Sequence, residues 1–543
     1  MEFKLTLAEL AEKVGVRKHP DWFSAIKVKY PPMDHQLTMM KLYARKTRYG
    51  DFGEPGVGKT YPSHFHGILM ASLGNKVVYT MPPKIIDQFV EELREYFRGI
   101  DTFLKIGQMN VTGAKKAKLR EEWDRDGWPD LLFISYDGYR EWNDVSKRKK
   151  VGSNQWYYED GSRYDAEQGG QAFTKDGRVV SRNGYAENDK HLLLNRKKYN
   201  VFFFDEAHAL CGLDSIISKS VVEASKQDTA IYLMTGTPVP TVISDAFGII
   251  RIINPEAYPS QSAFARQHVN TRPMTIPTGR GTGMRTIRVI DSFKNVEKIH
   301  EELYRNASRV QKRDVNRLPD PIITDVKVHL TGKHKKLYKD LMQNHFAIVG
   351  DTILAPEHQS QVRHMSLQII SCPTEFDPTI SMKNELFEAT KELVDTIDPK
   401  KNKIVVFAYY RAAIEFLAEE FKEYNPAVVY GGTSNATEEI NRFKQDPDCG
   451  IIFLNWMSGG AGLNLQVASH ILFYECPTSP KDAKQAIARC DRTGQHNIVN
   501  VYFMRVMQTL SDKNFRKLLL AEESNNDVVK DELDLLHKLI GRK

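Results

Sequence analysis

Short runs of consecutive apolar residues recur along the first half of the chain, and each is followed by polar residues and an amphipathic stretch. Four such runs occupy residues 76–80, 131–136, 201–204 and 231–234. Apolar runs of this length are typical of strands buried on both faces, whereas the spacing at residues 85–97 is helical. Strands and helices in alternation predict a parallel sheet covered on both sides, with function at the carboxyl ends of its strands.

The same rhythm returns in the second half of the chain. Four further apolar runs predict a second parallel sheet: residues 403–408, 427–430, 450–454 and 470–474. Between the two sheets the spacing is mainly helical, and we expect helices over residues 293–310, 333–348 and 357–370. A segment rich in Thr, Gly and Arg at residues 271–286 predicts a loop that interrupts them.

Three segments differ in composition from the predicted α/β regions. Residues 1–29 mix apolar and charged positions, which predicts a small helical lead-in. Residues 142–199 are polar and predict an insertion, with a β-hairpin signal at residues 173–179. Basic and aromatic residues interleave there, so the insertion either grips nucleic acid or is a solvated hairpin. Residues 511–543 predict an amphipathic helical tail packed on the second sheet domain.

These patterns divide the chain into five parts. We expect them at residues 1–29 (lead-in), 30–255 (first α/β domain, with the insertion), 256–380 (helical region), 381–510 (second α/β domain) and 511–543 (tail). A length of 543 residues agrees with two to four domains.

Composition excludes several classes of protein. A hydrophobic content of 41% is ample for globular packing. No apolar run is long enough to span a bilayer and the first residues lack a signal peptide, so we expect a soluble, intracellular protein without a membrane partner. The five cysteines are too scattered for a disulfide framework or a zinc pattern. A net charge of +7 permits nucleic-acid binding through local patches but does not require it.

A phosphate-binding loop follows the first predicted helical region. Gly53–Thr60 fits the pattern G-x-x-x-x-G-K-[ST], in which glycines let backbone N–H groups surround a phosphate. Lys59 would neutralise the β and γ oxygens, and the Thr60 hydroxyl would bind Mg²⁺. A helix over residues 63–73, ended by Gly74, would add its dipole to the site. The loop therefore predicts a bound nucleotide phosphate and Mg²⁺.

An acidic pair, Asp205 and Glu206, follows the third apolar run. Near a phosphate loop, the first carboxylate can hold Mg²⁺ and the second can polarise a water for attack on the γ-phosphate. The alternative is a solvated pair that ends a strand. The phosphate loop favours the catalytic interpretation.

The second half of the chain has no phosphate loop but carries Arg489 and Arg492, three residues apart. We expect both on one face of a helical turn. A guanidinium from one domain that meets a γ-phosphate held by another acts as an arginine finger. The alternative is an ordinary pair on a surface helix.

Taken in order along the chain, these motifs resemble the motor of superfamily 2 helicases, and most closely the Swi/Snf branch of DNA translocases. Five more segments are similar to parts of that motor: Gln36 to its adenine-reading glutamine, Asp205–His208 to its acidic DEAH box, Thr235–Pro238 to its coupling motif, Gly459–Leu465 to its fifth motif and Gln485–Gln495 to its sixth. The sequence departs from the branch at Val239–Thr241, Ala488 and Asp491, and the strand before the phosphate loop, residues 48–52, is unusually polar.

The resemblance implies an α/β fold of two RecA-like lobes, each a doubly wound parallel sheet, with a helical insertion between them and ATP in the cleft between the lobes. The implied catalytic residues are Lys59, Glu206, Arg489 and Arg492, and the implied Mg²⁺ ligands are Thr60 and Asp205. The implied nucleotide-binding residues are Gln36, Gly53, Glu54, Pro55, Gly56, Val57, Gly58, Lys59, Thr60 and Gln485. The implied DNA-binding residues are Pro82, Pro83, Lys84, Ser135, Tyr136, Ser458, Gly459 and Gly460.

The function expected from this resemblance is an ATP-dependent motor that translocates on DNA, with duplex favoured. Two alternatives stay open. One is a strand-separating helicase whose wedge is the insertion at residues 142–199. The other is a nucleic-acid-binding scaffold with a silent ATPase, which the complete set of catalytic residues argues against.

Overall fold

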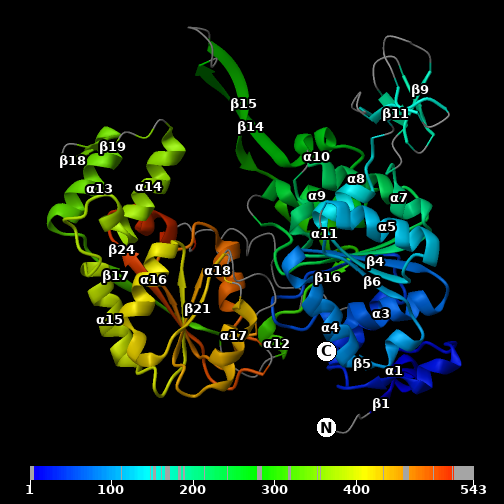
Figure 1. Cartoon of the computed structure of the whole chain (residues 1–543), viewed down its shortest axis with the longest axis horizontal. Coiled ribbons are helices and arrows are strands. Elements are labelled where there is room, and N and C mark those ends of the chain that lie inside the picture. Colours follow the sequence, from blue (N-terminus) through cyan, green and yellow to red (C-terminus); the bar gives the residue numbers. More distant parts are fainter. Residues whose placement is uncertain are drawn as a thin grey trace. The chain divides into compact units, whose positions relative to one another are not determined.

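A computed structural model (Figure 1) describes residues 5–111, 113–146, 148–150, 155–159, 162–164, 171–175, 177–181, 185–187, 190–212, 215–240, 243–277, 284–315, 320–350, 352–354, 356, 358–431, 433, 435–455, 464–492, 494–516 and 518. Contacts divide the chain into two compact units, each described by itself below. The first unit is Met1–Phe52 with Lys59–Ser308, and the second is Gly53–Gly58 with Arg309–Lys543.

A parallel seven-stranded sheet forms the centre of the first unit, in the order β16-β3-β13-β12-β4-β7-β6. Its strands are β3 (Arg48–Asp51), β4 (Lys76–Met81), β6 (Ile106–Met109), β7 (Leu131–Ser135), β12 (Tyr199–Asp205), β13 (Ala230–Met234) and β16 (Ala307–Ser308). The four predicted apolar runs are confirmed as β4, β7, β12 and β13. They are almost wholly buried, which explains why their sequences do not alternate.

Helices surround this sheet: α2 (Asp34–Tyr43), α3 (Thr60–Ser72), α4 (Ile86–Tyr96), α5 (Ala114–Asp126), α6 (Tyr136–Trp142), α7 (Leu193–Arg196), α8 (Ile216–Ala224), α9 (Ala246–Ile253), α10 (Gln261–His268) and α11 (Val296–Tyr304). The predicted helix after the phosphate loop is confirmed as α3. A Cβ on its Gly67 would lie 1.9 Å from the Tyr79 hydroxyl oxygen, so only glycine lets α3 pack this closely on β4. The Tyr79 hydroxyl in turn donates to the Ser63 carbonyl oxygen at 2.8 Å.

The N-terminal lead-in contains the expected helix, α1 (Leu7–Val14). Thr6 and Glu9 form a capping box at its start, and Gly15 ends it at φ 91°. The lead-in also contributes strands to a small sheet that sequence periodicity did not indicate, made of β1 (Leu5–Thr6), β2 (Lys27–Val28) and β5 (Phe97–Arg98).

The insertion has two small antiparallel pairs. β8 (Arg148–Lys150) pairs with β11 (Tyr185–Glu187), and β9 (Ala172–Phe173) pairs with β10 (Val179–Val180), which confirms the predicted hairpin. Ala172, Val180 and Ala186 form a core of its own. At its base the Glu141 carboxylate binds the ammonium groups of Lys116 and Lys190.

The predicted loop at residues 271–286 is wrong. β14 (Val269–Pro277) and β15 (Met284–Phe293) form a long antiparallel ribbon there. The described side chains on both faces of this ribbon reach solvent. The sequence therefore shows no regular alternation of apolar residues with polar ones such as Thr and Arg. Sequence analysis therefore had no buried face to detect.

The region between the two sheets is only partly helical. The three predicted helices exist, as α11, α13 (Gly332–Asn344) and α14 (Gln359–Ser371), and α12 (Lys312–Val315) is an additional short one. The region also contains β16, which joins the first sheet, β17 (Ile322–Val328), which joins the second, and a small hairpin of β18 (Ala347–Val349) and β19 (Thr352–Leu354).

A parallel six-stranded sheet forms the centre of the second unit, in the order β17-β24-β23-β20-β22-β21. The predicted runs are confirmed as β20 (Ile404–Ala408), β21 (Ala427–Val429), β22 (Ile451–Asn455) and β23 (His470–Phe473), and β17 and β24 (Asn500–Val506) complete the sheet. Four helices that follow α14 are α15 (Glu385–Ile397), α16 (Arg411–Glu420), α17 (Ala436–Gln445) and α18 (Pro480–Ile487), and residues 510–516 are also helical.

Alternate residues of the second sheet belong to two hydrophobic cores, as a doubly covered sheet requires. Val406 of β20 packs in a core with residues of α13, α14, α15 and α16, whereas Val405 and Phe407 pack in another with residues of α17 and α18. Phe515 belongs to the second core, so the beginning of the predicted tail packs on this unit. Residues 517 and 519–543 of the tail lie outside the described residues.

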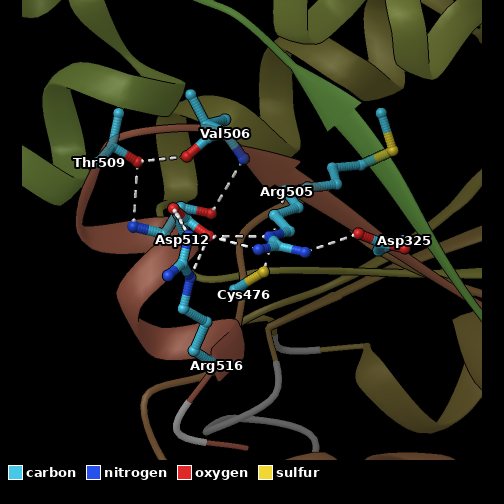
Figure 2. A network of polar contacts seen from close by, with 9 residues as sticks. Asp325, Cys476, Arg505, Val506, Thr509, Asp512 and Arg516 are labelled. Atoms are coloured by element: carbon cyan, nitrogen blue, oxygen red, sulfur yellow. Dashed lines mark hydrogen bonds and ion pairs between the residues drawn. The ribbon is translucent and has the colours of Figure 1, made fainter. Parts of the chain in front are cut away.

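Arg505 of β24 joins three segments of the second unit (Figure 2). Its guanidinium donates to the Asp325 carboxylate of β17 at 2.8 Å and to the Asp512 carboxylate at 2.7 Å. Arg516 donates to the same Asp512 carboxylate at 3.1 Å. Asp512 is buried, and burial by itself would raise the pKa of its carboxyl. The guanidinium groups of Arg505 and Arg516 outweigh this effect and hold the pKa below its usual value.

Candidate functional site

The predicted motifs of the first half gather at one edge of the first sheet. Because the strands are parallel, their carboxyl ends lie at the same edge, and β3, β13, β12, β4 and β7 are consecutive neighbours. The phosphate loop follows β3, the coupling motif follows β13, the acidic box follows β12, and the two predicted DNA-contacting segments follow β4 and β7. The topology alone therefore brings five separate motifs together.

The polar strand before the phosphate loop fits the sheet because its polar groups are satisfied. Arg48 donates to the Ile252 carbonyl oxygen at 3.0 Å. The Tyr43 hydroxyl donates to the buried Asp51 carboxylate at 3.4 Å, and the Asp51 carbonyl oxygen accepts from the Thr235 N–H at 3.1 Å. Asp51 thus connects the strand of the phosphate loop to the coupling motif, a role that sequence reasoning missed.

The phosphate loop has the backbone that its glycines predict. Gly56 and Gly58 adopt φ angles of 90° and 83°, which are in the left-handed region that favours glycine. Lys59 and Thr60 begin α3, so the first N–H groups of a long, buried helix follow the loop directly. This is the geometry of an anion-binding loop.

Residues Gly53–Gly58 make their contacts within the second unit. The Glu54 N–H donates to the Val310 carbonyl oxygen at 2.9 Å. The Glu54 carboxylate accepts from the Arg309 guanidinium at 2.8 Å and from the Lys312 N–H at 2.9 Å. The Lys312 ammonium then pairs with the Asp491 carboxylate. Asp491, a departure from the Swi/Snf pattern, therefore has an ion-pair partner within the second unit.

Arg489 provides a test of whether the second unit can hold an anion. Its side chain is 7% exposed, and among the described residues its Nη1 atom has no hydrogen-bond partner. Burial, with Arg492 nearby, lowers the pKa of this guanidinium to about 10. A buried cation with an unsatisfied donor costs free energy unless an anion binds it, so the residues present fit a phosphate group.

Arg489 and Arg492 do not lie on a helical turn, contrary to the prediction. α18 ends at Ile487, and both arginines follow it in turns closed by bonds such as Cys490 N–H to the Ile487 carbonyl oxygen at 3.1 Å. Gln485 lies in the last turn of α18 and is half-buried.

The acidic box begins at the last residue of β12, Asp205. Burial raises the pKa of its carboxyl, the Glu206 carboxylate raises it further, and the Lys59 ammonium opposes the shift. Lys59 and Asp205 are therefore close enough to interact, as a shared Mg²⁺–phosphate site requires. Glu206 has φ 54° and ψ 45°, a left-handed conformation that is strained for a residue with a Cβ. Such strain is typical of functional positions.

His208 links the acidic box to the coupling motif. Its Nδ1 atom lies 3.1 Å from Oε2 of Glu206 and 3.3 Å from the Thr235 hydroxyl oxygen. The Thr235 hydroxyl oxygen also accepts from the Thr237 N–H at 3.1 Å. A change in the position of Glu206 can therefore be transmitted to the Thr235–Pro238 loop.

Tyr136 links the acidic box to a predicted DNA-contacting segment. Its hydroxyl donates to the Asp205 carbonyl oxygen at 2.8 Å. Burial, Asp205 and Glu206 all raise the pKa of the Tyr136 hydroxyl, so it keeps its proton and stays a donor. The neighbouring Ser135 caps α6, because its hydroxyl oxygen accepts from the Gly138 N–H at 3.1 Å.

The remaining predicted site residues have varied surroundings. Pro83 and Lys84 form a 3₁₀ turn, Pro83–Ile85, directly after Pro82 at the end of β4. Gln36 is buried, and its side-chain oxygen accepts from the Met33 N–H at 2.9 Å, so here it caps α2. Ser458, Gly459 and Gly460 lie outside the described residues.

Two further observations concern the described part of the chain alone. It contains no cluster of three or more His, Cys, Asp or Glu side chains suited to a metal ion. None of its helices combines the length and apolar character needed to cross a bilayer.

Comparison with known proteins gives matches over most of the chain. A family model described as the SNF2-related domain matches residues 37–376, and one described as the helicase conserved C-terminal domain matches residues 385–494. Among curated proteins, the TATA-binding protein-associated factor MOT1 of Saccharomyces cerevisiae is 23% identical over 62% of this chain and 20% of its own length. The Zorya protein ZorD of Escherichia coli is 23% identical over 59% of this chain and 30% of its own length.

The relatives are much longer than this chain, whereas one solved structure has a similar length. The chain spans 28% of the CHD3-type chromatin-remodeling factor CHR7 of Arabidopsis thaliana, which is 21% identical over 65% of this chain. The chain thus corresponds to less than a third of each of these relatives. The Sulfolobus solfataricus SWI2/SNF2 ATPase core in complex with dsDNA is 18% identical, with a TM-score of 0.37 over 92% of this chain and 93% of that one.

Proposed function

This chain belongs to the SNF2-related family, and we propose that it is a DNA-dependent ATPase that uses ATP and Mg²⁺ to translocate on double-stranded DNA. One observation carries the proposal: the end of the phosphate loop (Lys59–Thr60), the acidic box, the coupling motif and two segments that we expect to contact DNA follow neighbouring strands of one parallel sheet at its carboxyl edge. Hydrogen bonds join the acidic box to the coupling motif and to Tyr136, so a change at the acidic box can reach one of the segments proposed to contact DNA.

The residues of the first unit divide the chemistry among them. Bound ATP and Mg²⁺ supply the transferable phosphoryl group and a compact positive charge. Lys59 neutralises phosphate oxygens with its ammonium, while the Thr60 hydroxyl and the Asp205 carboxylate hold the cation. The Glu206 carboxylate orients the attacking water and accepts its proton.

Arg489 and Arg492 are proposed to stabilise the charge that develops on the γ-phosphate. The support is the buried, unsatisfied guanidinium of Arg489, because a desolvated cation binds an anion more strongly than a solvated one. Gln36 and Gln485 are proposed to contact the nucleotide, and Pro82–Lys84 and Ser135–Tyr136 the DNA backbone. Contacts to phosphates carry no base sequence, so the motor would move on any sequence.

The packing inside the insertion favours translocation over strand separation. A wedge needs aromatic rings that are free to stack on bases. Trp156 and Tyr164 instead pack against the insertion's own small core. The Tyr158 ring lies 5.1 Å from the Tyr164 ring, and the Arg163 guanidinium lies 5.4 Å from the Tyr157 ring.

ATPase rates with duplex DNA, single-stranded DNA and no DNA test the proposal directly. We expect duplex to stimulate most, and a third strand to be displaced from a triplex without unwinding of the duplex. Replacing residues 147–189 by a short Gly/Ser linker separates the two motor types. Residues 190–196 are kept because Lys190 pairs with Glu141 and Leu193 and Leu194 are buried. Loss of forked-duplex unwinding on this deletion alone would favour the helicase.

A further inference from the structure

The ribbon of β14 and β15 has no part in the proposed ATP site, yet it is the longest two-stranded element of the described chain. It extends from the body of the first unit (Figure 1). Met274 is 47% exposed and Ile290 is 51% exposed. An isolated pair of strands buries little apolar surface and is only marginally stable in water. The register places the Met274 and Ile290 side chains on opposite faces, so they do not form one apolar patch.

The root of the ribbon is firmly held. His268 is fully buried at the end of α10, and its ring accepts or donates on both sides: Nε2 lies 2.8 Å from the Tyr258 hydroxyl and Nδ1 lies 3.3 Å from the Lys294 carbonyl oxygen. The Lys294 N–H returns a bond to the His268 carbonyl oxygen at 3.0 Å, and Asn295 donates to the Gln267 carbonyl oxygen at 2.9 Å. The ribbon therefore projects from a fixed base.

The charge of the ribbon is positive on both faces. Its strands carry three arginines and one acid, Asp291. The register pairs Arg272 with Val289 and Pro273 with Arg288, so Arg272 and Arg288 lie on opposite faces. The Arg272 side chain is 66% exposed and pairs with Asp291 at 3.3 Å, an exposed contact that a phosphate can replace at little cost.

The dimensions of the ribbon match one groove of DNA. Two paired strands with side chains measure about 10 Å across, which fits the ~12 Å major groove of B-DNA but not the ~6 Å minor groove. A strand of this length spans about 30 Å, close to one turn of duplex at ~34 Å. We propose that the β14–β15 ribbon lies in the major groove of duplex DNA, with Arg272 and Arg288 on the phosphates to either side.

Strand addition by a protein partner is disfavoured on this ribbon. Pro273 and Pro277 remove two N–H groups from β14, an arrangement that blunts a strand edge against pairing. The positive charge favours a polyanion for the same reason that it disfavours a second copy of the ribbon. The proposal rests on the proposed function, because duplex DNA is the substrate named there.

The test measures binding of a labelled 30-base-pair DNA duplex as a function of salt. Arg272→Ala/Arg288→Ala should weaken binding about tenfold or more near 0.1 M salt and lower the slope of log affinity against log salt by about 2. The matched control Arg125→Ala/Arg305→Ala removes two exposed guanidinium groups elsewhere in the unit, each paired with an acid as Arg272 is, and it should change binding less than twofold. ATP hydrolysis without DNA should be unchanged in both.

Two further probes identify the groove. Duplex RNA has a deep, narrow major groove that side chains cannot enter, so its affinity should not depend on the ribbon arginines. Bulky substituents on the 5-position of pyrimidines fill the major groove of a DNA duplex. Wild-type protein should bind such a duplex more weakly than unmodified DNA, by the same factor as the double variant weakens binding to unmodified DNA.

The outcomes separate the ribbon from the motor. The first outcome is that wild-type protein binds duplex DNA and is stimulated by it, and that the ribbon variant binds equally well with the same salt slope. This outcome overturns the ribbon proposal alone. Equal weakening of duplex DNA, duplex RNA and single strands also overturns it. A wild-type protein that neither binds duplex nor is stimulated by it overturns the proposed function, and the ribbon proposal with it.

Discussion

The hydroxyl of Tyr136 donates a 2.8 Å hydrogen bond to the main-chain carbonyl oxygen of Asp205. Tyr136 belongs to a segment proposed to contact DNA, and Asp205 directly precedes the proposed catalytic base. Tyr136 directly follows β7 and Asp205 ends β12, and these two strands are not neighbours because β4 lies between them in the sheet. The bond is therefore a specific bridge across the active edge, and it gives a route by which bound DNA can position Glu206.

Tyr136→Phe should uncouple ATP hydrolysis from DNA. Removing the hydroxyl breaks the bridge while the ring keeps its packing, so we expect hydrolysis without DNA to stay within about twofold and stimulation by duplex to fall about tenfold, the change that follows from a loss of about 1.4 kcal/mol. Steady-state rates at saturating duplex measure it. Tyr139→Phe is the matched control, since its hydroxyl on the same helix accepts from Asn143 at 3.0 Å and should leave the stimulation intact.

Glu206→Gln should abolish hydrolysis but retain ATP binding. The amide cannot accept the proton of the attacking water, and a loss on the order of a hundredfold or more is expected. Equilibrium binding of a labelled ATP analogue and single-turnover hydrolysis measure the two effects separately. Glu256→Gln, an exposed carboxylate in the same unit, serves as control. Unchanged turnover of the Glu206 variant would mean that the acidic box is misassigned.

Lys59→Ala should weaken nucleotide binding itself, because the phosphates lose their direct charge partner. In the same variant the pKa of Asp205 should rise further, since Lys59 is the group that opposes the rise. Calorimetric titration with ATP tests the first effect. Normal affinity in this variant would contradict the assignment of the phosphate loop.

Arg492→Ala should lower turnover strongly and leave ATP affinity nearly unchanged. A guanidinium that acts on charge developing in the transition state affects hydrolysis more than ground-state binding, with a loss of about 10³-fold for an arginine finger. Duplex-stimulated turnover and ATP affinity are measured side by side. Arg442→Ala provides a control within the same unit, because that guanidinium binds the Asn425 carbonyl oxygen and the Glu439 carboxylate. Full turnover in Arg492→Ala would remove the arginine from the proposed site.

His64→Phe should reduce the acid sensitivity of the first unit. Burial lowers the pKa of both His64 and His66 to about 3, so below pH ~6.5 the unfolded chain binds protons that the folded unit excludes. Each histidine therefore destabilises the unit as pH falls from 6.5 towards 3, by about 2 kcal/mol at pH 5. The His64 ring packs 4.5 Å from the Phe89 ring, so phenylalanine is chosen to keep an aromatic contact at this position.

Denaturant unfolding at pH 7.5 and pH 5 measures this effect. Tryptophan fluorescence reports mainly on the first unit, since Trp456 is the single tryptophan of the chain that belongs to the second. The difference in unfolding free energy between the two pH values should shrink by about 2 kcal/mol in His64→Phe. It should not change in His19→Phe, which replaces a partly exposed histidine of the same unit. An unchanged difference in the first variant would show that His64 is protonated in the folded unit.

Sequence reasoning predicted most of the two sheets because their central strands are buried on both faces. β4 and β20 are nearly continuous apolar runs, and burial is the property that such runs report. β17 was missed because it mixes charged and apolar residues at a sheet edge, and β14 and β15 were missed because neither described face of the ribbon is buried. Strand pairing between distant segments has no local signal.

The candidate site was predictable in its parts but not in its connections. Motif spacing indicated Lys59, Asp205 and Glu206 because phosphate and metal chemistry needs those residue types. The bonds from Tyr136 to Asp205 and from His208 to Thr235 depend on strand order and register, which the sequence does not display. The strained backbone of Glu206 is likewise invisible in a sequence, since nothing about glutamate predicts a positive φ.

The pairing of β17 with β24 sets an order of events during synthesis. Asp325 and Arg505, which join the two strands, are 180 residues apart, so a ribosome adding 5–20 residues per second needs about 10–35 s between them. During that interval β17 has no partner strand, so its Ile322 and Ile323 side chains are exposed to solvent. Both are about half exposed even in the finished sheet. The nascent second unit therefore presents an unpaired, apolar strand to chaperones and to neighbouring chains until β24 emerges, and its sheet is completed late in synthesis.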